Sequence, residues 1–365
     1  MPRKKISSRN IALFAGPSPA TGTHDAGSIK ELYGIQSFSY EVTTSKEDIS
    51  VFGQGASITR EALDPAVVTL NTSYLVSNFD NEKSLGFEVR TPSGPNTGNT
   101  SGAFASLLNT TKDERNYFAM IAADGADGVN STVASTPCLG FGNGTITSYN
   151  FNAAVGSYPT ATIAVEAIEI AYYANSNAQI IPAINTATNA VTTTPFTLNT
   201  PSGTISGRDP ILRPWDITVS LTGATGLFHD LANACVQSID IGVEFGRTNQ
   251  LCLGSRFRKE SLISDVIPIT VAVEMLAKDM STGRLSSLTC LTGTSYGITA
   301  SIKRPGCSAG TIATLFDIRG LSYEGQSEDV ALGGDAQTVT LNFQGTVGGA
   351  NDTTRGLFMS GIVNT

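Results

Sequence analysis

The residues of this chain that could do chemistry are few and poorly placed for it. The stretch DGADGVN offers Asp124, Asp127 and Asn130 as oxygen ligands for calcium, but it lacks the alternate-position carboxylates and the closing Glu of a calcium-binding loop. We interpret it as a surface turn. The glycine-rich GFGNG at 140–144 precedes an expected strand rather than a helix, so no helix N-terminus is predicted there to bind phosphate.

Nucleophilic and metal-ligating side chains are equally scarce. There are two histidines, His24 and His229, and five cysteines without a C-x-x-C pair, so a zinc site has almost no ligands to draw on. The chain contains no H-E-x-x-H, G-x-S-x-G or P-loop motif. We expect no enzyme activity, no catalytic residue, no metal and no cofactor, and we expect the cysteines to be buried reduced thiols.

Composition indicates a protein built from strands. Of the 365 residues, 15% are charged and 40% are hydrophobic, and 37 are glycine. Low charge combined with many Gly, Thr, Ser and Asn residues favours strands and turns over helical bundles. The apolar content suffices for a sizeable core, and no apolar run is long enough for a transmembrane helix.

Charge separates a short N-terminal arm from the rest of the chain. The net charge is −8, from 23 basic and 31 acidic residues, and four of the basic residues lie within 1–9. The remainder holds 19 basic against 31 acidic residues, a net charge of −12, which would repel a nucleic-acid backbone. Because no apolar run follows the basic start, we expect no secretory signal.

An internal repeat organises the chain. The forty residues from Gln36 align without gaps to the forty from Gln237, at a constant offset of 201 positions. Apolar and polar residues alternate in the same phase at the start of both copies, which predicts a half-buried strand in each. The side chains predicted to face the core are those of Phe38, Tyr40, Val42, Ile239, Ile241 and Val243.

The order of later elements repeats as well. A short helix, a strand and a terminal strand pair are expected at 101–109, 116–124 and 147–167, and again at 282–290, 295–303 and 321–344. Between the copies, residues 175–207 carry no charge but many apolar side chains, so we expect an extended segment that packs on a surface. The predicted fold class is all-β, with two tandem β-sandwich or half-barrel domains, each with a short flanking helix.

Each copy also contains a 21-residue loop between its first two strands, at 45–65 and 246–266. A loop of this length is unusual inside a compact domain, and both loops carry apolar side chains. Either the loop folds back on its own domain, or it forms an extended hairpin that is buried on another subunit. Its recurrence favours the second interpretation. The first loop holds two basic and four acidic residues, and the second holds four basic and two acidic.

The opening NIALFAGPSPATG at 10–22, followed by a strand, a protruding loop with FGQG, a strand, a short helix and a closing strand pair, resembles the tail tube proteins of long-tailed bacteriophages. The duplication resembles those members that carry two tube domains in one polypeptide. The resemblance covers most of 10–170 and 215–345. It implies that six sandwich domains close a ring, that their inner sheets join into one β-barrel around a channel, and that stacked rings conduct DNA. Two domains per chain then imply trimeric rings.

The repeat and the charge-free segment divide the chain into a basic arm at 1–9, two domains at 10–174 and 214–365, and a linker at 175–213. The resemblance makes the two domains tube domains, but it has no counterpart for the linker. The implied partners are further copies of the chain, other tail proteins at the tube ends and phage DNA that passes without sequence-specific binding, with no membrane. The implied location is the virion tail, after synthesis in the host cytoplasm. The alternatives are another β-rich virion protein, such as a head-decoration protein, and a carbohydrate-binding β-sandwich.

The resemblance further implies that the two long loops contact the next ring. The basic excess of the second loop predicts that Arg256, Arg258 and Lys259 face an acidic surface there. The residues predicted for these inter-ring contacts are Ile49, Val51, Phe52, Ile58, Arg60, Leu251, Leu253, Arg256, Phe257, Arg258 and Lys259. The polar faces of the first strands offer candidates for the lumen, although ordinary solvent exposure accounts for them equally well. These candidates are Glu41, Thr43, Asp240 and Glu244.

Overall fold

The computed structural model describes most of the chain and is nearly all β, with 58% strand and 4% helix, which confirms the predicted class. The described residues are 10–17, 24, 27–91, 101–108, 113–123, 126–128, 131–201, 210–222, 235–263, 266–276, 295–304, 312–329 and 338–361. Within these ranges, no helix has the length and apolar character needed to cross a membrane.

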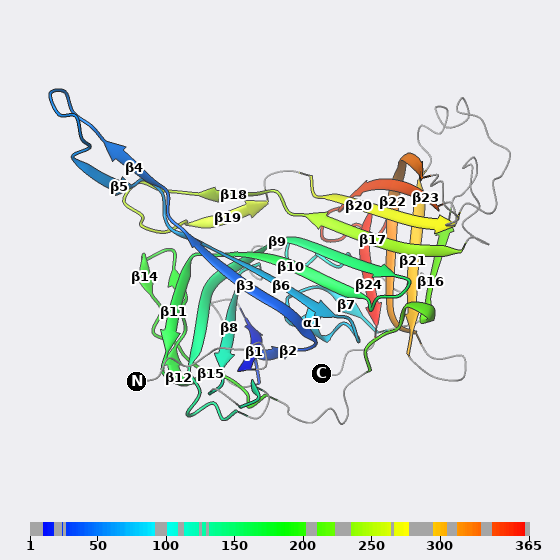
Figure 1. Ribbon diagram of the computed structural model, residues 1–365, viewed down its shortest axis with the longest axis horizontal. Coiled ribbons are helices and arrows are strands. Elements are labelled where there is room, and N and C mark those ends of the chain that lie inside the picture. Colours follow the sequence, from blue (N-terminus) through cyan, green and yellow to red (C-terminus); the bar gives the residue numbers. More distant parts are fainter. Residues whose placement is uncertain are drawn as a thin grey trace.

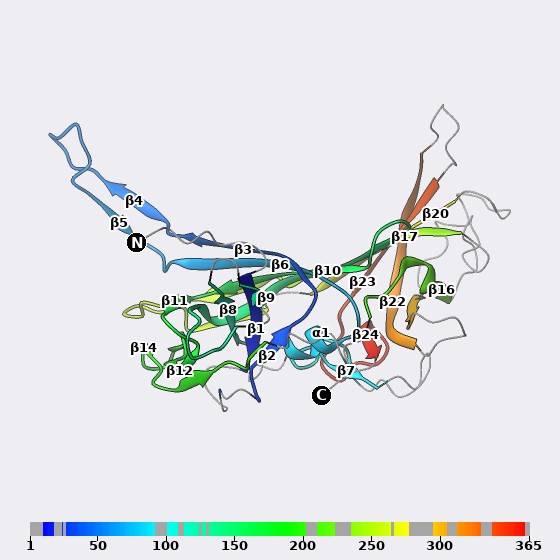
Figure 2. The same cartoon turned by 60° about the horizontal axis from the view of Figure 1, so that its bottom comes forward.

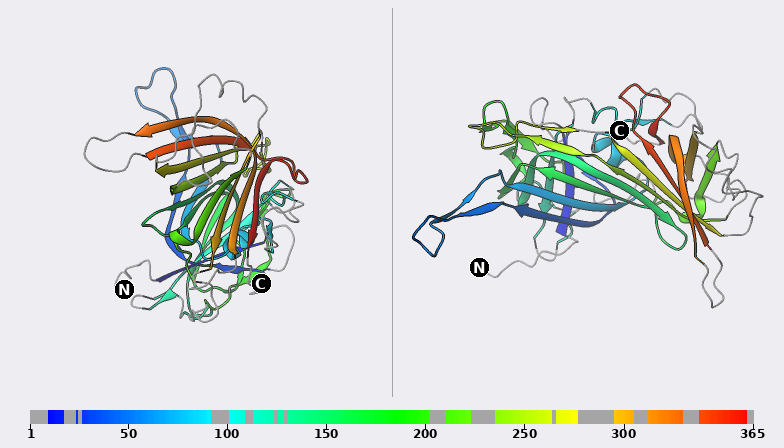
Figure 3. Two further views of the ribbon diagram at one scale, coloured as in Figure 1. Left: turned by 90° about the vertical axis from the view of Figure 1, so that its right-hand side faces the viewer. Right: turned by 90° about the horizontal axis from the view of Figure 1, so that it is seen from above.

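Eight antiparallel strands form one long sheet (Figure 1). In spatial order they are β22 (Ile312–Asp329), β23 (Thr338–Thr346), β20 (Pro268–Leu276), β17 (Val236–Glu244), β9 (Cys138–Ala154), β10 (Thr160–Ala167), β6 (Val67–Leu75) and β3 (Ile35–Thr43). Seen from above, the colours run from blue at β3 to orange at β22 (Figure 3, right). Buried and more exposed residues alternate along β6, β10, β20 and β23, so one face of the sheet is apolar and the other is polar.

A second layer of shorter strands covers the apolar face and consists of two groups. The long strands β9 and β22 each belong to both layers and connect one group to the long sheet. The first group is β2 (Lys30–Leu32), β1 (Ile11–Gly16), β8 (Arg115–Ile121), the start of β9 and β11 (Glu169–Tyr173). The second group is β16 (Ile217–Thr222), β21 (Tyr296–Lys303), the start of β22, β24 (Gly356–Gly361) and the parallel strand β7 (Val89–Arg90).

The strands of the aligned segments recur at the predicted offset. The long loops form two hairpin arms, β4–β5 (Lys46–Ile49 and Thr59–Ala62) and β18–β19 (Arg247–Gln250 and Glu260–Ile263). In β3 and β17, β4 and β18, β5 and β19, and β6 and β20, both ends of the two strands are 201 positions apart. The gap-free alignment therefore describes equivalent strands.

The later strands recur too, at an offset that differs from the first. In the first half of the chain (10–174), Tyr117 pairs with Phe141, and in the second half (214–365) Ile298 pairs with Ile318 at the equivalent place. Equivalent residues of β9 and β22 are therefore 177 positions apart in the sequence. Each contains a β-bulge, and the extra residues, Thr147 and Glu324, differ by the same 177 positions. The left-handed residue that lets each strand bend is Asn143 (φ 51°) in β9 and, at the equivalent position, Gly320 (φ 75°) in β22.

One hydrophobic core runs through both halves. The Phe151 ring from β9 lies 4.4 Å from the Phe316 ring of β22, which in turn lies 5.0 Å from Phe79. The α-helix of the described part is α1 (Asp80–Ser84), and a 3-10 turn, η3 (Pro214–Asp216), precedes β16. The helix predicted at 101–109 is wrong, since 101–108 form turns, and 282–290 lies outside the described residues.

The uncharged linker packs on the outer layer of the first half. It forms two small hairpins, β12–β15 (Asn177–Ile180 and Pro195–Thr197) and β13–β14 (Ile184–Asn185 and Ala190–Val191). Phe196 lies over Phe118 of β8, with ring centroids 4.5 Å apart. The GFGNG stretch lies inside β9 rather than before a strand, and a Cβ at Gly142 would come within 1.7 Å of the Pro182 carbonyl oxygen. Glycine there allows the linker to approach.

Candidate assembly surfaces

Strand β3 forms one open edge of the long sheet. Among the described strands it pairs with β6 alone. Tyr40 and Val42 are 45% and 48% exposed, although the Tyr40 ring faces the core and lies 5.4 Å from the ring of Phe141. The predicted burial of Tyr40 and Val42 is therefore wrong for the single chain, in which β3 is an edge strand and Val42 lines an open cavity with Ile168 and Phe257.

Strand β17, the equivalent of β3, lies in the middle of the sheet. It pairs with β20 on one side and with β9 on the other. Ile239, Ile241 and Val243 are at most 1% exposed, so their predicted burial is confirmed. The two strands carry the same alternating pattern, but β17 has a neighbouring strand on both sides and β3 has one on a single side.

The pairing of β17 with β9 is the junction between the two halves of the chain. At the other end of the sheet, the equivalent part of β22, residues 322–329, pairs with β23 and with no second strand in the described ranges. The sheet is therefore open, and the closed barrel expected of a ring is not found in one chain. Its two edges, β3 and the end of β22, are the equivalents of the two strands that meet in the junction.

The β4–β5 arm extends away from the sheet (Figures 1 and 2). Ile49 and Val51 are each 44% exposed, Ile58 is 55% exposed, and Phe52 at the tip is fully exposed. Arg60 and Asp48 form an ion pair of 3.5 Å between well-exposed side chains, which contributes little to stability. The four apolar residues that were predicted to make contacts thus lie on a surface that this chain leaves uncovered.

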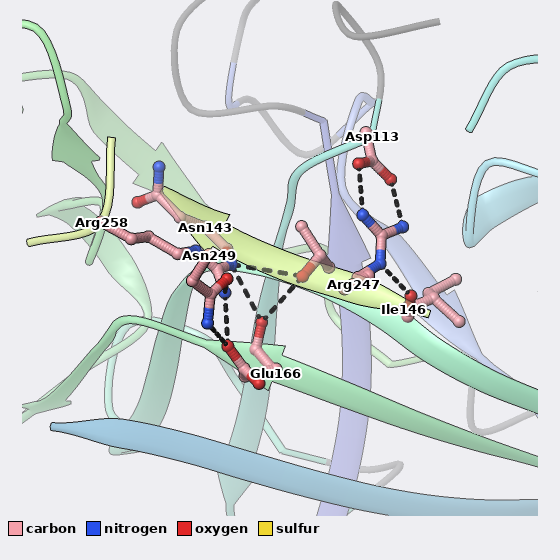
Figure 4. A network of polar contacts seen from close by, with 8 residues as sticks. Asp113, Asn143, Ile146, Glu166, Arg247, Asn249 and Arg258 are labelled. Carbon is pink, nitrogen blue, oxygen red and sulfur yellow. Dashed lines mark hydrogen bonds and ion pairs between the residues drawn. The ribbon is translucent and has the colours of Figure 1, made fainter. Parts of the chain in front are cut away.

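The β18–β19 arm, in contrast, is bonded to the first half of its own chain (Figure 4). Arg258 is 3% exposed, and its guanidinium donates to the Glu166 carboxylate at 2.7 Å and to the Asn143 carbonyl at 2.8 Å. The Thr145 hydroxyl accepts a further bond at 3.2 Å, and the Asn249 amide donates to Glu166 at 2.7 Å. Burial lowers the pKa of Arg258, and the Glu166 carboxylate opposes that shift.

A second buried ion pair holds the base of the same arm (Figure 4). Both terminal nitrogens of Arg247 donate to the two carboxylate oxygens of Asp113, at 2.6 and 2.7 Å. Its Nε donates to the Ile146 carbonyl at 2.6 Å. This bidentate geometry satisfies both charges, which a buried pair requires in order to repay its desolvation.

These contacts correct one prediction. Arg258 was expected to face an acidic surface of another ring, but the acid that it meets is Glu166 of its own chain, so this arm folds back as in the first interpretation of the loop. Arg256, Lys259, Leu251 and Leu253 are exposed, whereas Phe257 is half-buried. Their contact with another ring, and that of Arg60, stays a prediction. Sequence reasoning missed the side chains that bind the two buried arginines of the arm, which are Asp113, Glu166 and Thr145.

The lumen candidates lie on polar positions of the long sheet. Glu41, Thr43 and Glu244 are exposed. Asp240 is half-buried and accepts hydrogen bonds from the amides of Asn150 and Asn152, at 3.0 and 3.2 Å, across the junction with β9. No described contact tests whether these side chains face a channel, so that assignment stays a prediction.

Cysteine placement differs from the expectation. Cys138 is buried, and burial raises the pKa of its thiol to about 11. Cys235 and Cys252 are free but exposed, so the prediction of burial is wrong for them, and Cys290 and Cys307 lie outside the described residues. Among the side chains that the structure describes, no group of three or more His, Cys, Asp or Glu could hold a metal ion.

Comparison with known proteins identifies no family for this chain. No family model and no curated protein matches the chain. A solved structure of the SPP1 tail tube, from solid-state NMR and cryo-EM, is similar over 47% of this chain and 80% of that chain, with 10% sequence identity and a TM-score of 0.30. A likeness of this strength defines neither the fold nor the function of the chain.

Proposed function

We propose that the chain is a structural virion protein whose copies join edge to edge into rings, and that the stacked rings form the hollow tail tube through which phage DNA passes. The contrast between β3 and β17 carries the proposal. Equivalent strands present apolar residues at equivalent positions, buried in β17 and half exposed at the β3 edge. An open apolar edge strand invites pairing with another chain, and ring closure would remove the edge.

The chain's own junction supplies a register for contact between copies. In it, Glu244 lies opposite Ser148 and Gly242 lies opposite Asn150. Shifting the β17 residues by 201 positions and the β9 residues by 177 places Thr43 opposite Gly325, and Glu41 opposite Ser327. We therefore propose that β3 of one copy pairs antiparallel with β22 of the next copy and that this covers Tyr40 and Val42.

Ring closure with three copies follows from the duplication. A contact between two different edges generates either a closed ring or an open filament, and the rotation per contact decides between them. If the junction within a chain and the contact between chains are equivalent, each chain supplies two of the positions around the ring. The six-domain ring that the resemblance implies then contains three chains with pseudo-sixfold symmetry.

The charge supports a role as a conduit. The polar face of the long sheet carries Glu41, Thr43, Asp240 and Glu244, and the proposal places this face toward the channel. Acidic side chains repel phosphates, and hydroxyl side chains add no positive charge that would bind them, so DNA would slide without adhering. In this proposal the further partners are other tail proteins at the tube ends, the location is the virion tail after synthesis in the host cytoplasm, and the protein is not an enzyme.

Negative-stain microscopy of purified protein, combined with sedimentation velocity, tests the proposal. We expect rings or hollow tubes from the wild type. Tyr40→Asp should leave a folded monomer that does not assemble, with an unchanged far-UV circular dichroism spectrum. Wild-type protein that stays monomeric and binds only to capsids would identify a head-decoration protein instead, and glycan-dependent binding by monomers would identify a carbohydrate-binding protein.

A further inference from the structure

The β18–β19 arm contacts the first half of its own chain, whereas the equivalent β4–β5 arm is exposed. The first contact can therefore serve as a template for a contact of the β4–β5 arm with another copy. We propose that the β4–β5 arm lies across β22 and β23 of the neighbouring copy in the same ring, with Gln344 of that copy donating a hydrogen bond to Asp48. This inference rests on the proposed ring and names the surface that each arm occupies in it.

The template is the pair of bonds to Glu166 of β10. Arg258 and Asn249 of the second arm each donate to the same carboxylate oxygen at 2.7 Å. A carboxylate on the sheet is thus the acceptor, and the arm supplies the donors.

The equivalent residues reverse this polarity. In the first arm, Ser57 replaces Arg258 and Asp48 replaces Asn249, each 201 positions earlier. On the sheet, Glu166 pairs with Thr69 and Gln344 pairs with the equivalent Thr270, so Gln344 is the counterpart of Glu166. Neutral Ser57 and Gln344 thus stand at the positions of the charged pair Arg258 and Glu166. In the template Asn249 donates to Glu166, and at the equivalent positions the Gln344 amide can donate to the Asp48 carboxylate. Asp48, Ser57 and Gln344 are all exposed in the single chain.

A second equivalent contact lies at the base of the arm. Arg247 donates to the Ile146 carbonyl of β9 at 2.6 Å. The counterparts are Lys46 and the carbonyl of Tyr323 on β22. An ammonium group retains the donor function of the guanidinium, and the exposed Glu324 next to Tyr323 adds an opposite charge. The base of the first arm is therefore complementary to the same neighbour that β3 would pair with.

The first arm then has two parts with different contacts. Its base, with Lys46 and Asp48, acts within the ring, whereas its tip extends beyond the neighbour's sheet. On the second arm, by contrast, the tip is bonded to the linker, since the Ser255 hydroxyl donates to Asn189 at 2.9 Å and the Asn189 amide donates to the Gly254 carbonyl at 3.3 Å.

A charge change and its rescue test the inference by sedimentation velocity over a series of protein concentrations. Gln344→Glu places a carboxylate next to Asp48 of the neighbour, and we expect the concentration at half-assembly to rise about tenfold. Adding Ser57→Arg recreates the pair seen between Arg258 and Glu166 and should return that concentration to within about threefold of wild type. Thr188→Glu, which adds the same charge to an exposed linker residue, is the control and should change little.

Cysteine cross-linking provides a second readout that does not depend on affinity. In a background in which Cys235, Cys252, Cys290 and Cys307 are replaced by Ser, Asp48→Cys combined with Gln344→Cys should be cross-linked between chains by a short bismaleimide, whose span suits two side chains joined by a hydrogen bond better than a direct disulfide does, and neither single variant should cross-link. If rings form but Gln344→Glu assembles normally and the double-cysteine chain does not cross-link, the arm inference is wrong and the ring proposal stands. If the wild type forms no rings, both are wrong.

Discussion

The two halves of the molecule differ most informatively in what covers their equivalent strands. In the outer layer, β1 and β16 pair alike, with Phe14 opposite Phe118 and Ser220 opposite Thr299. The linker covers β1, and Phe14 is fully buried. No linker covers β16 in the described part of the chain, and Ser220 is exposed.

The long sheet shows the opposite relation. β3 lacks the cover that β17 has, yet its side chains have not become polar, since Tyr40 and Val42 stand where Ile241 and Val243 are buried. In the outer layer, a missing cover coincides with a polar sequence. An apolar residue retained at an uncovered edge therefore indicates a cover that another copy supplies. This difference is the physical basis of the proposed ring.

The largest expected effect separates β17 from β3. Ile241→Asp would bury a carboxylate without a partner in the core, and we expect a loss of about 5 kcal/mol or more in unfolding free energy, enough to prevent folding. Tyr40→Asp, one repeat earlier, should cost about 1 kcal/mol or less in the monomer because the residue is half exposed. Urea unfolding measures both. Equal losses in the two variants would contradict the comparison.

The next effect compares the arms. Arg247→Met leaves Asp113 buried without its partner, which should cost about 3–5 kcal/mol, and adding Asp113→Asn should restore part of the loss. Lys46→Met at the equivalent position should leave the stability of the monomer unchanged. The measurement is again urea unfolding at a concentration that keeps the protein monomeric. If Arg247→Met changes stability by less than about 1 kcal/mol, the second arm is not held as described.

A pH effect on stability near neutrality is expected from a buried carboxyl group in the first half. Glu82 of α1 is buried and accepts hydrogen bonds from Tyr74 and Tyr149, whose counterparts in the second half are Met275 and Gln326. Burial raises the pKa of Glu82 to about 7. Because the folded chain binds this proton more tightly than the unfolded chain, its contribution to stability falls as the pH rises from about 4.5 to about 7.

The variant Glu82→Gln keeps an acceptor for the tyrosines but cannot ionise. Relative to wild type, it should gain about 3 kcal/mol in unfolding free energy between pH 4 and pH 8. Chemical unfolding of both proteins across this range gives the difference directly. A difference that does not change with pH would show that Glu82 does not titrate in this window.

The smallest effect concerns DNA rather than folding. Glu41→Lys combined with Thr43→Lys should make assembled tubes retain DNA at low salt, with an affinity that falls steeply as salt rises. The matched control is Thr218→Lys with Ser220→Lys, on the exposed outer face of β16. Retention of DNA by the control tubes alone would place the channel on the other face of the sheet.

The alternation of apolar and polar residues was enough to predict the position of a strand and the face that it turns to the core. The alternation at Phe38–Val42 and Ile239–Val243 placed β3 and β17 and the face that each turns to the core. The same pattern could not show which of the two is an edge, because that depends on pairing with β9, which lies more than eighty residues from β17. Matching 147–167 to 321–344 in the sequence also set β9 against β22 at an offset of 174 positions instead of 177.

The arm network was beyond sequence reasoning for the same reason. Arg247 and Asp113 are 134 positions apart, and Arg258 and Glu166 are 92 positions apart, so no spacing rule connects them. The available signal was the excess of basic residues in the second loop, which calls for acidic partners without naming them. The prediction of a short helix at 101–109 was wrong for a local reason. Two apolar residues three positions apart, Phe104 and Leu107, are typical of a helix, but turns place the same two side chains in the core.

In the proposed ring, β3 of one copy completes the sheet of the next, and a cryo-EM reconstruction of the assembled protein would resolve this pairing. We expect β3 to run antiparallel to β22 of the adjacent copy, with Thr43 opposite Gly325, Glu41 opposite Ser327, and Tyr40 and Val42 buried. Assemblies in which β3 faces solvent, or pairs with β3 of another copy, would contradict it.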